Sequence, residues 1–398
     1  MRVLWISSLA WKVDGQYEYP VSGSGAVAGS CFEQNIIEGM EELGCEVDII
    51  ADYPYKRTGV RRIAGEYWSH NGTSVDYRLP YYDMGYASIL CKEYYIRKIV
   101  REKLARSRYD VVVVYLIHHP YMTAFPLVKK LAKDTKTLLI CPDLPDMMDM
   151  SLKEKAVKKF LKKIDKYRII QKYRHVDSFV LFSDAMIERL PVADKPHITI
   201  EGVSSVSELD TSIVEKSYAV LHAGTLHKNI GIENIIQAFQ YIHDKNLELW
   251  IFGDGELVDY IQEKSKEDDR IKYMGFVDRD KLFEFLKKAR VLINARNPAD
   301  EYTKYSFPSK MFEYIYSGTP FLTTKLNGIP NEYWEYVRPL NDNAPQTIAE
   351  SILKILKEDC DNQERIQSCR IFVEKNKGKV EQGRKLFDFL QSLLIEKK

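Results

Sequence analysis

Short apolar runs alternate with longer amphipathic stretches along the whole chain, a pattern typical of parallel sheets joined by crossover helices. In the first half this pattern predicts strands at Val3–Ser7, Val47–Ala51, Val111–Tyr115, Thr137–Cys141 and Ser178–Phe182. In the second half it predicts strands at Tyr218–Ala223, Leu247–Phe252, Val291–Ala295 and Phe321–Thr324. The sequence therefore predicts an α/β fold whose two halves wind in the same way.

The length of 398 residues is too great for one ordinary core, so two domains are expected. A small, polar stretch without periodicity, residues 202–212, is the best candidate for their connection. We expect a first domain at 1–203, a linker at 204–216 and a second domain at 217–375. Residues 376–398 predict an amphipathic helix, and one interpretation returns that helix to the first domain.

The composition, 45% apolar and 29% charged, is that of a soluble globular protein. A net charge of +1 argues against a dedicated nucleic-acid binder, so no nucleic-acid partner is expected. No segment approaches the roughly 20 apolar residues that span a bilayer. The six cysteines form no CxxC pair and indicate reduced thiols, which together with the missing leader pattern favours a cytoplasmic location.

Three glycine-rich turns lie after predicted strands, one in the first half of the chain and two in the second. They contain Gly23 and Gly25, Gly224, and Gly253, respectively. Ligands of open α/β sheets bind outside the carboxyl ends of the strands, so these turns are candidate phosphate loops. None matches GxGxxG or the P-loop, so neither dinucleotide nor ATP binding in those modes is supported. Each turn alone is also an ordinary feature of an α/β fold.

Residues 304–324 predict a polar loop, a compact helix and a buried strand. Ser306 is the predicted N-cap and Pro308 lies in the predicted first turn. Lys310 would then oppose the helix dipole unless an anion docks at the helix start. Glu313 follows Lys310 at helical spacing, so the two side chains share a face. Two interpretations remain: a solvated Lys310–Glu313 pair, or a phosphate and sugar-hydroxyl site.

The series Ala223–Ile232, Phe252–Gly255, Gly275–Val277 and Phe307–Tyr314, in this order, resembles the GT-B glycosyltransferases of family 4. These are retaining enzymes that use nucleotide sugars, and the likeness is greatest to polysaccharide-assembly members with a Phe-Pro-Ser-Lys element. The resemblance covers essentially the whole chain and is specific mainly over residues 218–333. It implies a GT-B architecture, in which two Rossmann-like domains face a central crevice and a C-terminal helix follows.

The resemblance also implies roles for individual residues. Glu313 corresponds to the glutamate that holds the nucleotide ribose, and Lys228 lies in the loop that often supplies a cation to the diphosphate. The positions that contact the diphosphate and sugar correspond to Ser306, Phe307, Pro308, Ser309 and Lys310. Arg296 is a further phosphate candidate, although a surface arginine is an equal interpretation. Tyr305 stands where the family has its other glutamate.

The implied reaction transfers a hexose from a nucleoside-diphosphate sugar to an acceptor hydroxyl with retention. The implied pathway is the assembly of a cell-surface polysaccharide such as exopolysaccharide, capsule or O-antigen. No cofactor and no metal are expected, because cations and backbone amides would neutralise the diphosphate. Accordingly Asp278-Arg-Asp280 is interpreted as a helix cap and not as a metal motif. The alternatives are a non-catalytic nucleotide-sugar-binding or accessory subunit and, less favoured, a nucleotide-sugar epimerase.

Candidates for the acceptor side lie in the first half. His118 and His119 follow the strand Val111–Tyr115, where either could orient an acceptor hydroxyl or serve as a structural histidine. Residues 152–173 predict a helix with an apolar stripe among lysines. Such a helix could lie on an anionic membrane surface and meet a lipid-linked acceptor, or it could pack its stripe into the core.

Overall fold

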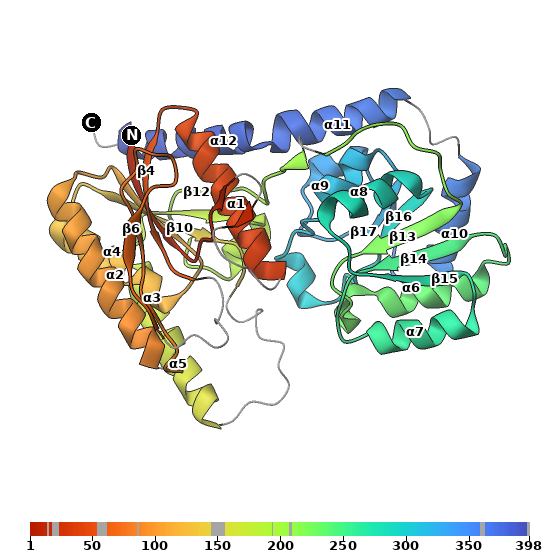
Figure 1. Cartoon of the computed structure of the whole chain (residues 1–398), viewed down its shortest axis with the longest axis horizontal. Helices are drawn as coiled ribbons and strands as arrows, with labels where there is room; N and C mark the ends of the chain where they lie inside the picture. The colour runs from red at the N-terminus through yellow and green to blue at the C-terminus, as the bar shows by residue number, and fades with distance from the viewer. Residues whose placement is uncertain are drawn as a thin grey trace. The chain divides into compact units, whose positions relative to one another are not determined.

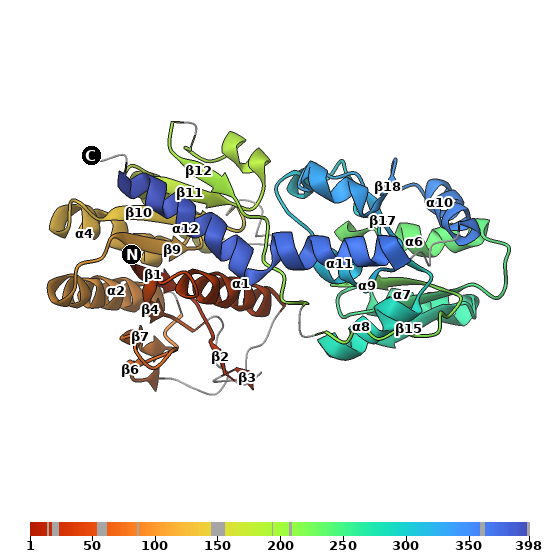
Figure 2. The same cartoon turned by 90° about the horizontal axis from the view of Figure 1, so that it is seen from above.

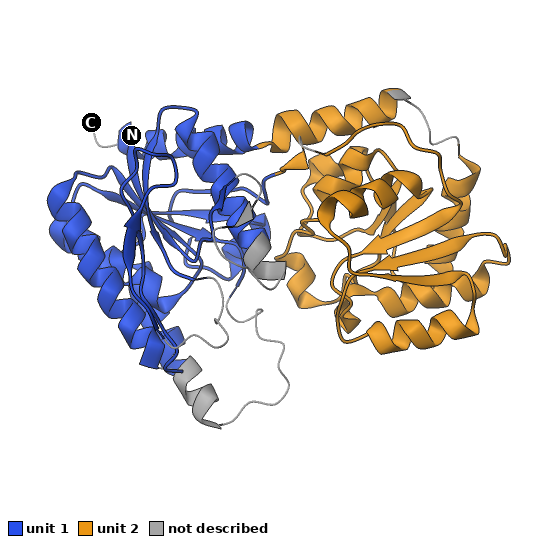
Figure 3. Cartoon of the chain, in the orientation of Figure 1, with its two compact units in different colours: residues 1–203, 379–398 blue, residues 204–378 orange. Residues whose placement is uncertain are grey.

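The structure is a computed structural model of residues 1–398. It describes residues 1–13, 16–17, 24–53, 62–85, 87–144, 156–192, 194–206, 209–358 and 363–395. The chain forms two compact units, residues 1–203 with 379–398 and residues 204–378 (Figure 3). Each unit contains its own sheet of mainly parallel strands, flanked by helices (Figure 1). Gly23 and the start of the predicted helix at residues 152–155 lie outside the described residues.

The sheet of the first unit has eight strands among the described residues. In spatial order they are β12 (His197–Thr199), β11 (Ser178–Leu181), β10 (Lys136–Cys141), β9 (Val111–Tyr115), β1 (Arg2–Ser7), β4 (Glu46–Ala51), β7 (Asp76–Arg78) and β6 (Glu66–Trp68). All neighbours are parallel except β6 and β7. Short antiparallel ribbons pair β2 (Lys12–Val13) with β3 (Gln16–Tyr17) and β5 (Arg62–Ile63) with β8 (Tyr81–Tyr82).

The helices of the first unit are α1 (Ser24–Glu41), α2 (Ala87–Arg106), α3 (His119–Met122), α4 (Ala124–Leu131), α5 (Ala156–Tyr173) and α12 (Lys379–Ile395), with a 3-10 helix at Asp184–Glu188. α12 crosses and packs against α1, and the two helices are next to each other in both views (Figures 1 and 2). The two helices approach closely at Gly39 and Gly383, where a Cβ on Gly383 would lie 2.5 Å from the Gly39 carbonyl carbon. Glycine at this crossing therefore lets the C-terminal helix complete the first unit's core.

A buried charge cluster joins α1 to the strands at the edge of the first sheet. The Nδ1 atom of His70 is 2.7 Å from the carboxylate of Asp76, and its Nε2 atom is 2.9 Å from that of Glu41. Burial lowers the pKa of His70, but these hydrogen bonds outweigh it and raise the pKa to about 9. The ring is therefore a cation at neutral pH.

The second unit has a six-stranded sheet in the described part of the chain, and every neighbouring pair is parallel. Its order is β15 (Ile271–Gly275), β14 (Glu248–Phe252), β13 (Ala219–Ala223), β16 (Val291–Asn294), β17 (Phe321–Thr324) and β18 (Arg338–Leu340). Its helices are α6 (Ile232–Ala238), α7 (Val258–Glu267), α8 (Arg279–Lys288), α9 (Met311–Ser317), α10 (Pro345–Lys357) and α11 (Gln363–Lys377). Short 3-10 helices lie at Lys228–Ile230, Phe239–Tyr241, Glu301–Lys304 and Asn331–Glu335.

Two apolar layers sandwich this second sheet. One face packs against α8, α9 and α11, and the other packs against α6, α7 and α10. Successive residues of β13 go to opposite layers, with Leu221 in the first and Val220 in the second. Val206 and Leu209, from the stretch predicted as a linker, are buried in the first layer. These residues thus belong to the core of the second unit.

All nine predicted strands are confirmed, with ends that differ by one residue at most. Among the strands that the pattern missed, β15 and β18 lie at the two edges of the second sheet. β15 alternates buried and exposed positions, so it lacks the continuous apolar run that marked the central strands. In α5, whose side chains are described from residue 163, Ile164 and Tyr167 are 37% and 65% exposed. Packing of that stripe into the core is therefore wrong for these two residues.

Candidate functional site

The candidate site lies at the edge of the second sheet where its strands end. Because all six strands are parallel, their carboxyl ends share this edge. The chain passes from β13 to β14 on one side, while β16 pairs with β13 on the other side. This reversal of direction is the topological switch point, where open α/β sheets bind ligands. Gly224 directly follows β13 and Arg296 follows β16, so the structure brings these two predicted residues to the same place.

The glycine turns at this edge pack against one another. Gly253 has φ of 135°, and a Cβ there would lie 1.8 Å from the carbonyl oxygen of Gly224. Gly231 has φ of 81°, and its Cβ would lie 1.9 Å from the carbonyl oxygen of Ala295. Only glycine allows both the backbone angle and the close approach. These loop contacts account for the glycines without any ligand.

Arg296 carries a positive charge into a largely buried position. Its Nη1 donates to the hydroxyl of Ser306 at 3.4 Å, whereas its Nε is buried without a hydrogen-bond partner. In the part of the chain that the structure describes, no acidic side chain pairs with it. Burial lowers the pKa of Arg296 because no anion compensates the lost solvation. The switch point therefore presents an uncompensated guanidinium.

His222 lies in the predicted strand Tyr218–Ala223, and its side chain lies near Gly224 at the switch point. It was not identified as a site residue from the sequence. Its ring is 2% exposed, and Nδ1 lies 3.0 Å from the carbonyl oxygen of Ile293. Burial lowers the pKa of His222 to about 4, so the ring is neutral and Nδ1–H donates to that carbonyl. Nε2 is left as a buried acceptor without a partner, 3.9 Å from where a Cβ on Gly224 would lie. A polar residue inside a buried strand was the one sequence signal for it.

The hydroxyl of Tyr314 fixes the end of β13. It accepts from the backbone N–H of Ala223 at 2.8 Å and donates to the carbonyl of the same residue at 3.0 Å. Tyr314 is 2% exposed and lies on α9. One hydroxyl therefore satisfies both backbone groups at the point where the strand turns into the Gly224 loop.

Glu313 lies between two cations. The ammonium of Lys310 is 3.3 Å from Oε2, which confirms that the two residues share a face of the helix. The Nε of Arg279 donates to Oε1 at 2.7 Å. Arg279 was missed because it lies 34 positions from Glu313 in the sequence. The capping interpretation of Asp278 is confirmed, since its side chain accepts from the N–H of Lys281 at 2.8 Å.

The start of α9 differs from the prediction. The helix begins at Met311 with Lys310 as its N-cap residue, so Ser306 as the cap and Pro308 in the first helical turn are both wrong. The N–H of Met311 donates to the carbonyl of Pro308 at 2.9 Å and closes a tight turn before the helix. Phe307 packs on core aromatic rings and holds the loop in place. Lys310 therefore lies at the cap and not in the first turn.

The remaining residues predicted in this unit lie on its loops. Lys228 is exposed at the start of a 3-10 turn, and its N–H donates to the carboxylate of Glu256 at 3.1 Å. Ser309 is exposed beside Lys310. Tyr305, at the position of the family's other glutamate, is only 5% exposed. The nearby acid Asp300 accepts from the amide of Asn297 at 3.1 Å.

The two histidines of the first unit have different surroundings. Both ring nitrogens of His119 contact protein groups, with Lys172 at Nδ1 and Glu93 at Nε2 (3.2 Å). His118 packs edge-on against Tyr121, and its buried Nδ1 has no hydrogen-bond partner. Burial lowers the pKa of His118 to about 3, so the ring is neutral.

Leu116, just after β9, has a φ of 80°, a strained backbone angle of the kind that is common at functional sites. Gly25 lies in the first turn of α1.

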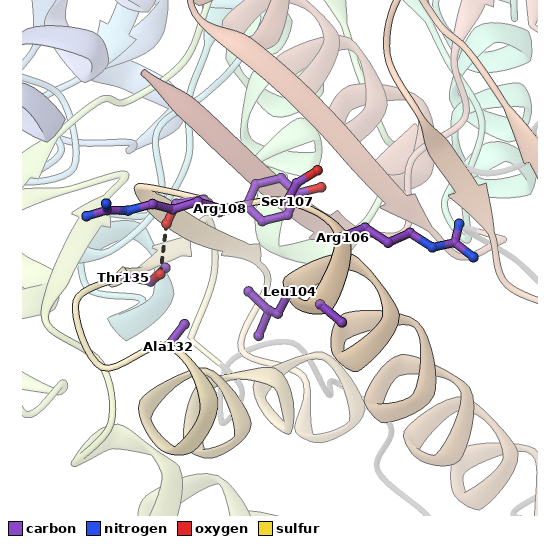
Figure 4. Close-up of a pocket in the computed structure, with 8 residues that line it drawn as sticks. Leu104, Arg106, Ser107, Arg108, Ala132 and Thr135 are labelled. Carbon is purple, nitrogen blue, oxygen red and sulfur yellow. Dashed lines mark hydrogen bonds between the residues drawn. The ribbon is translucent and has the colours of Figure 1, made fainter.

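A pocket of about 290 Å³ lies elsewhere in the first unit (Figure 4). It is lined by Leu104, Ala105, Arg106, Ser107, Arg108, Tyr109, Ala132 and Thr135. These residues come from the end of α2, the turn before β9 and the turn between α4 and β10, so the pocket lies toward the amino ends of the strands. Arg106 and Arg108 point away from each other in Figure 4. The pocket contains none of the predicted site residues.

Comparisons with known proteins agree with this geometry. The family described as "Glycosyl transferases group 1" matches residues 217–358, which include the whole candidate site of the second unit. Sucrose-phosphate synthase from Thermosynechococcus elongatus has 13% identity and a TM-score of 0.66, with 100% of both chains covered. The fold is GT-B. No curated relative matches the sequence.

Two other GT-B structures were solved with nucleotide bound. A TarM variant from S. aureus, in complex with fondaparinux, α-GlcNAc-glycerol and UDP, shares 10% identity at a TM-score of 0.62 and covers 98% of this chain and 100% of its own. Alr3699/HepE from Anabaena, in complex with UDP and glucose, shares 12% identity at a TM-score of 0.61 and covers 98% of this chain and 99% of its own. At these identities the likeness shows the GT-B fold alone.

Proposed function

We propose that this protein is a glycosyltransferase that moves a hexose from a nucleoside-diphosphate sugar to an acceptor hydroxyl with retention, in the assembly of a cell-surface polysaccharide. The group 1 domain and the GT-B fold support this proposal. The observation that carries it is Arg296, a largely buried guanidinium without an acidic partner at the switch point of the second sheet. A phosphate of the donor would neutralise that charge and complete its hydrogen bonds.

The chemistry of the second unit follows from charge. Transfer leaves negative charge on the departing diphosphate, and fixed cations in a partly desolvated site stabilise it more strongly than water does. Arg296, Lys228 and Lys310 supply these cations in the proposal, and Glu313 accepts hydrogen bonds from the ribose hydroxyls. No metal and no further cofactor take part in it. Gly23 and Gly25 of the first unit remain proposed donor-binding residues on the strength of the sequence resemblance.

The acceptor is assigned to the first unit and is a sugar or a lipid-linked oligosaccharide. His118 is the better candidate of the two histidines, because both ring nitrogens of His119 are already engaged. A ring with a pKa of about 3 is a weak base at neutral pH. Its role in the proposal is therefore to accept a hydrogen bond from the acceptor hydroxyl and orient it.

A membrane surface is a proposed partner of α5. Ile164, Tyr167 and Ile170 are exposed on this helix beside Lys163 and Lys166, a mixture of apolar and basic groups suited to an anionic bilayer surface. No helix among the described residues is long and apolar enough to cross a membrane. Sedimentation with anionic vesicles at low salt tests the proposal. Equal recovery with neutral vesicles would contradict it, and so would binding unchanged by Tyr167→Ser.

The deciding experiment measures nucleotide release from UDP-, GDP- and ADP-hexoses with simple sugar acceptors. Loss of release in Arg296→Met and Glu313→Ala, but not in Arg338→Met, would support the proposal. Arg338, on the edge strand β18 of the same unit, controls for the loss of a surface arginine, because it is 43% exposed and its Nε lies 3.9 Å from the carboxylate of Glu358. NMR of the product reports retention, and an epimerised donor without transfer would identify an epimerase.

A second candidate function is a non-catalytic nucleotide-sugar-binding or accessory subunit. It is motivated by Tyr305, a buried tyrosine where the family has an acid. Binding of a nucleotide sugar without turnover on any acceptor would favour it. Absence of both binding and release would overturn both candidates.

A further inference from the structure

The carboxylate of Glu313 is held from two sides by different helices. Oε1 accepts from Arg279 of α8 at 2.7 Å, and Oε2 lies 3.3 Å from the ammonium of Lys310 at the start of α9. The glutamate side chain is 14% exposed, whereas the two cations are 37% and 43% exposed. The acid is therefore the buried member of the trio and the cations are at its rim.

The topology explains how Arg279 reaches Glu313. α8 connects the edge strand β15 to β16, and its apolar residues pack on the sheet face that also carries α9. The first helical residue is Arg279, and Asp278 caps the helix through the N–H of Lys281. This cap fixes the backbone from which the guanidinium extends. A residue from the far edge of the sheet is thereby delivered to the centre of the candidate site.

We infer that Arg279 is a positioning residue that orients the carboxylate of Glu313 toward the two hydroxyls of the donor ribose. This inference rests on the proposed function. Each carboxylate oxygen has two lone-pair positions. One position on each oxygen is used by a cation, so one position on each remains for a vicinal diol. With both cations present the carboxylate cannot rotate freely.

Arg279 and Lys310 are not equivalent in this role. The guanidinium is planar and directional, whereas the ammonium of Lys310 is a flexible point charge. Removal of Arg279 leaves the Glu313 side chain beside one flexible cation, Lys310. The expected loss is therefore in the recognition of the ribose hydroxyls and not in the binding of phosphate.

The test measures how strongly the protein distinguishes ribose from deoxyribose. UDP, GDP and ADP are titrated by calorimetry, and the tightest binder is compared with its 2′-deoxy analogue. Hydrogen bonds to a charged group predict a preference of about tenfold or more for the ribonucleotide in the wild type. In Arg279→Met this preference should fall to about twofold, through weaker ribonucleotide binding, while deoxynucleotide binding stays within about twofold. Arg279→Lys should retain an intermediate preference.

Controls separate this inference from the proposed function. Glu313→Gln should also lose the preference, and Arg338→Met should keep it in full. If Glu313→Gln loses the preference but Arg279→Met keeps it, the pair serves only to pack α8 on α9 and the inference is overturned. If the wild type shows no preference that depends on Glu313, the ribose assignment in the proposed function fails first. If Arg279→Met lowers the melting temperature but keeps the preference for the ribonucleotide, the inference is likewise overturned.

Discussion

Replacement of Arg296 by methionine should change folding stability and ligand binding in opposite directions. The buried Nε of Arg296 has no hydrogen-bond partner, and its one described side-chain bond, to Ser306, is 3.4 Å long. An unsatisfied buried donor costs about 1–3 kcal/mol. Methionine has a similar length and no donor, so it removes this cost. We expect the free protein to be stabilised by about 1 kcal/mol.

The same change should weaken the binding of the donor. Hydrogen bonds between a guanidinium and a phosphate are charge-assisted, and each contributes about 1.5–3 kcal/mol. Loss of one or more of them predicts a rise of about 10- to 150-fold in the dissociation constant for a nucleoside diphosphate. Arg296→Lys should fall between the two, since it keeps the charge without the directional contacts.

Two measurements on the full-length protein check this prediction. Scanning calorimetry without nucleotide should show a melting temperature raised by about 2–4 °C in Arg296→Met. Titration calorimetry should show the weaker binding, and Arg338→Met should match the wild type in binding. A destabilised Arg296→Met that binds nucleotide as well as the wild type would refute the reasoning. It would show that Arg296 is a structural cation whose compensation lies within the protein.

Three further predictions concern the framework. Tyr314→Phe removes the hydroxyl bonded to both backbone groups of Ala223, so the protein should lose about 1–3 kcal/mol, measured by urea denaturation; an unchanged midpoint would contradict this. Gly383→Ala brings a methyl group within 2.5 Å of the Gly39 backbone and should cost about 1–3 kcal/mol, seen as early exposure of α12 to proteolysis, whereas alanine at the exposed Ser392 should cost little. The contribution of His70 is complete below its unfolded pKa of 6.5 and is lost as the pH rises through about 9. In His70→Asn the denaturation midpoint should vary less between these two pH values, and an identical pH profile would exclude the charged ring.

The central strands could be predicted from sequence because each is a continuous run of buried, mostly apolar residues. β9 is five apolar or aromatic residues in a row, and β17 is a buried run after Pro320, so each is recognisable without its neighbours. The edge strand β15 could not be recognised, since two of its five positions are exposed and only Ile271 is buried. The predicted start of α9 was also wrong. Pro308 satisfies the rule for a first turn, but its carbonyl closes a separate turn with Met311. Capping rules describe local preference, and tertiary packing of Phe307 decided the boundary.

The candidate site was predictable only where its residues lie close in sequence. Lys310 and Glu313 are three residues apart, and their contact follows from helical periodicity. The partners that complete the site are distant: Arg279 is 34 positions from Glu313, and Tyr314 is 91 positions from Ala223. No pattern along the chain encodes these pairs. They follow from the strand order, which places the connections after β13, β15 and β16 at one edge.

The charged residues at the carboxyl edge of the second sheet differ in burial and in pairing. These differences predict which residues act in donor binding and which act in catalysis. The two cations beside Glu313 are partly exposed and have an acid, so their electrostatic contribution to an anion is reduced. Arg296 is largely buried and has no acid among the described residues. Negative charge develops on the departing diphosphate during transfer, and an interaction that strengthens as this charge develops lowers the barrier. Arg296 should therefore affect kcat more than Lys310 does. Loss of Lys310 should mainly raise KM. Steady-state kinetics of Arg296→Lys and Lys310→Met would reveal that difference, and equal effects on kcat would place the departing phosphate between the two cations instead.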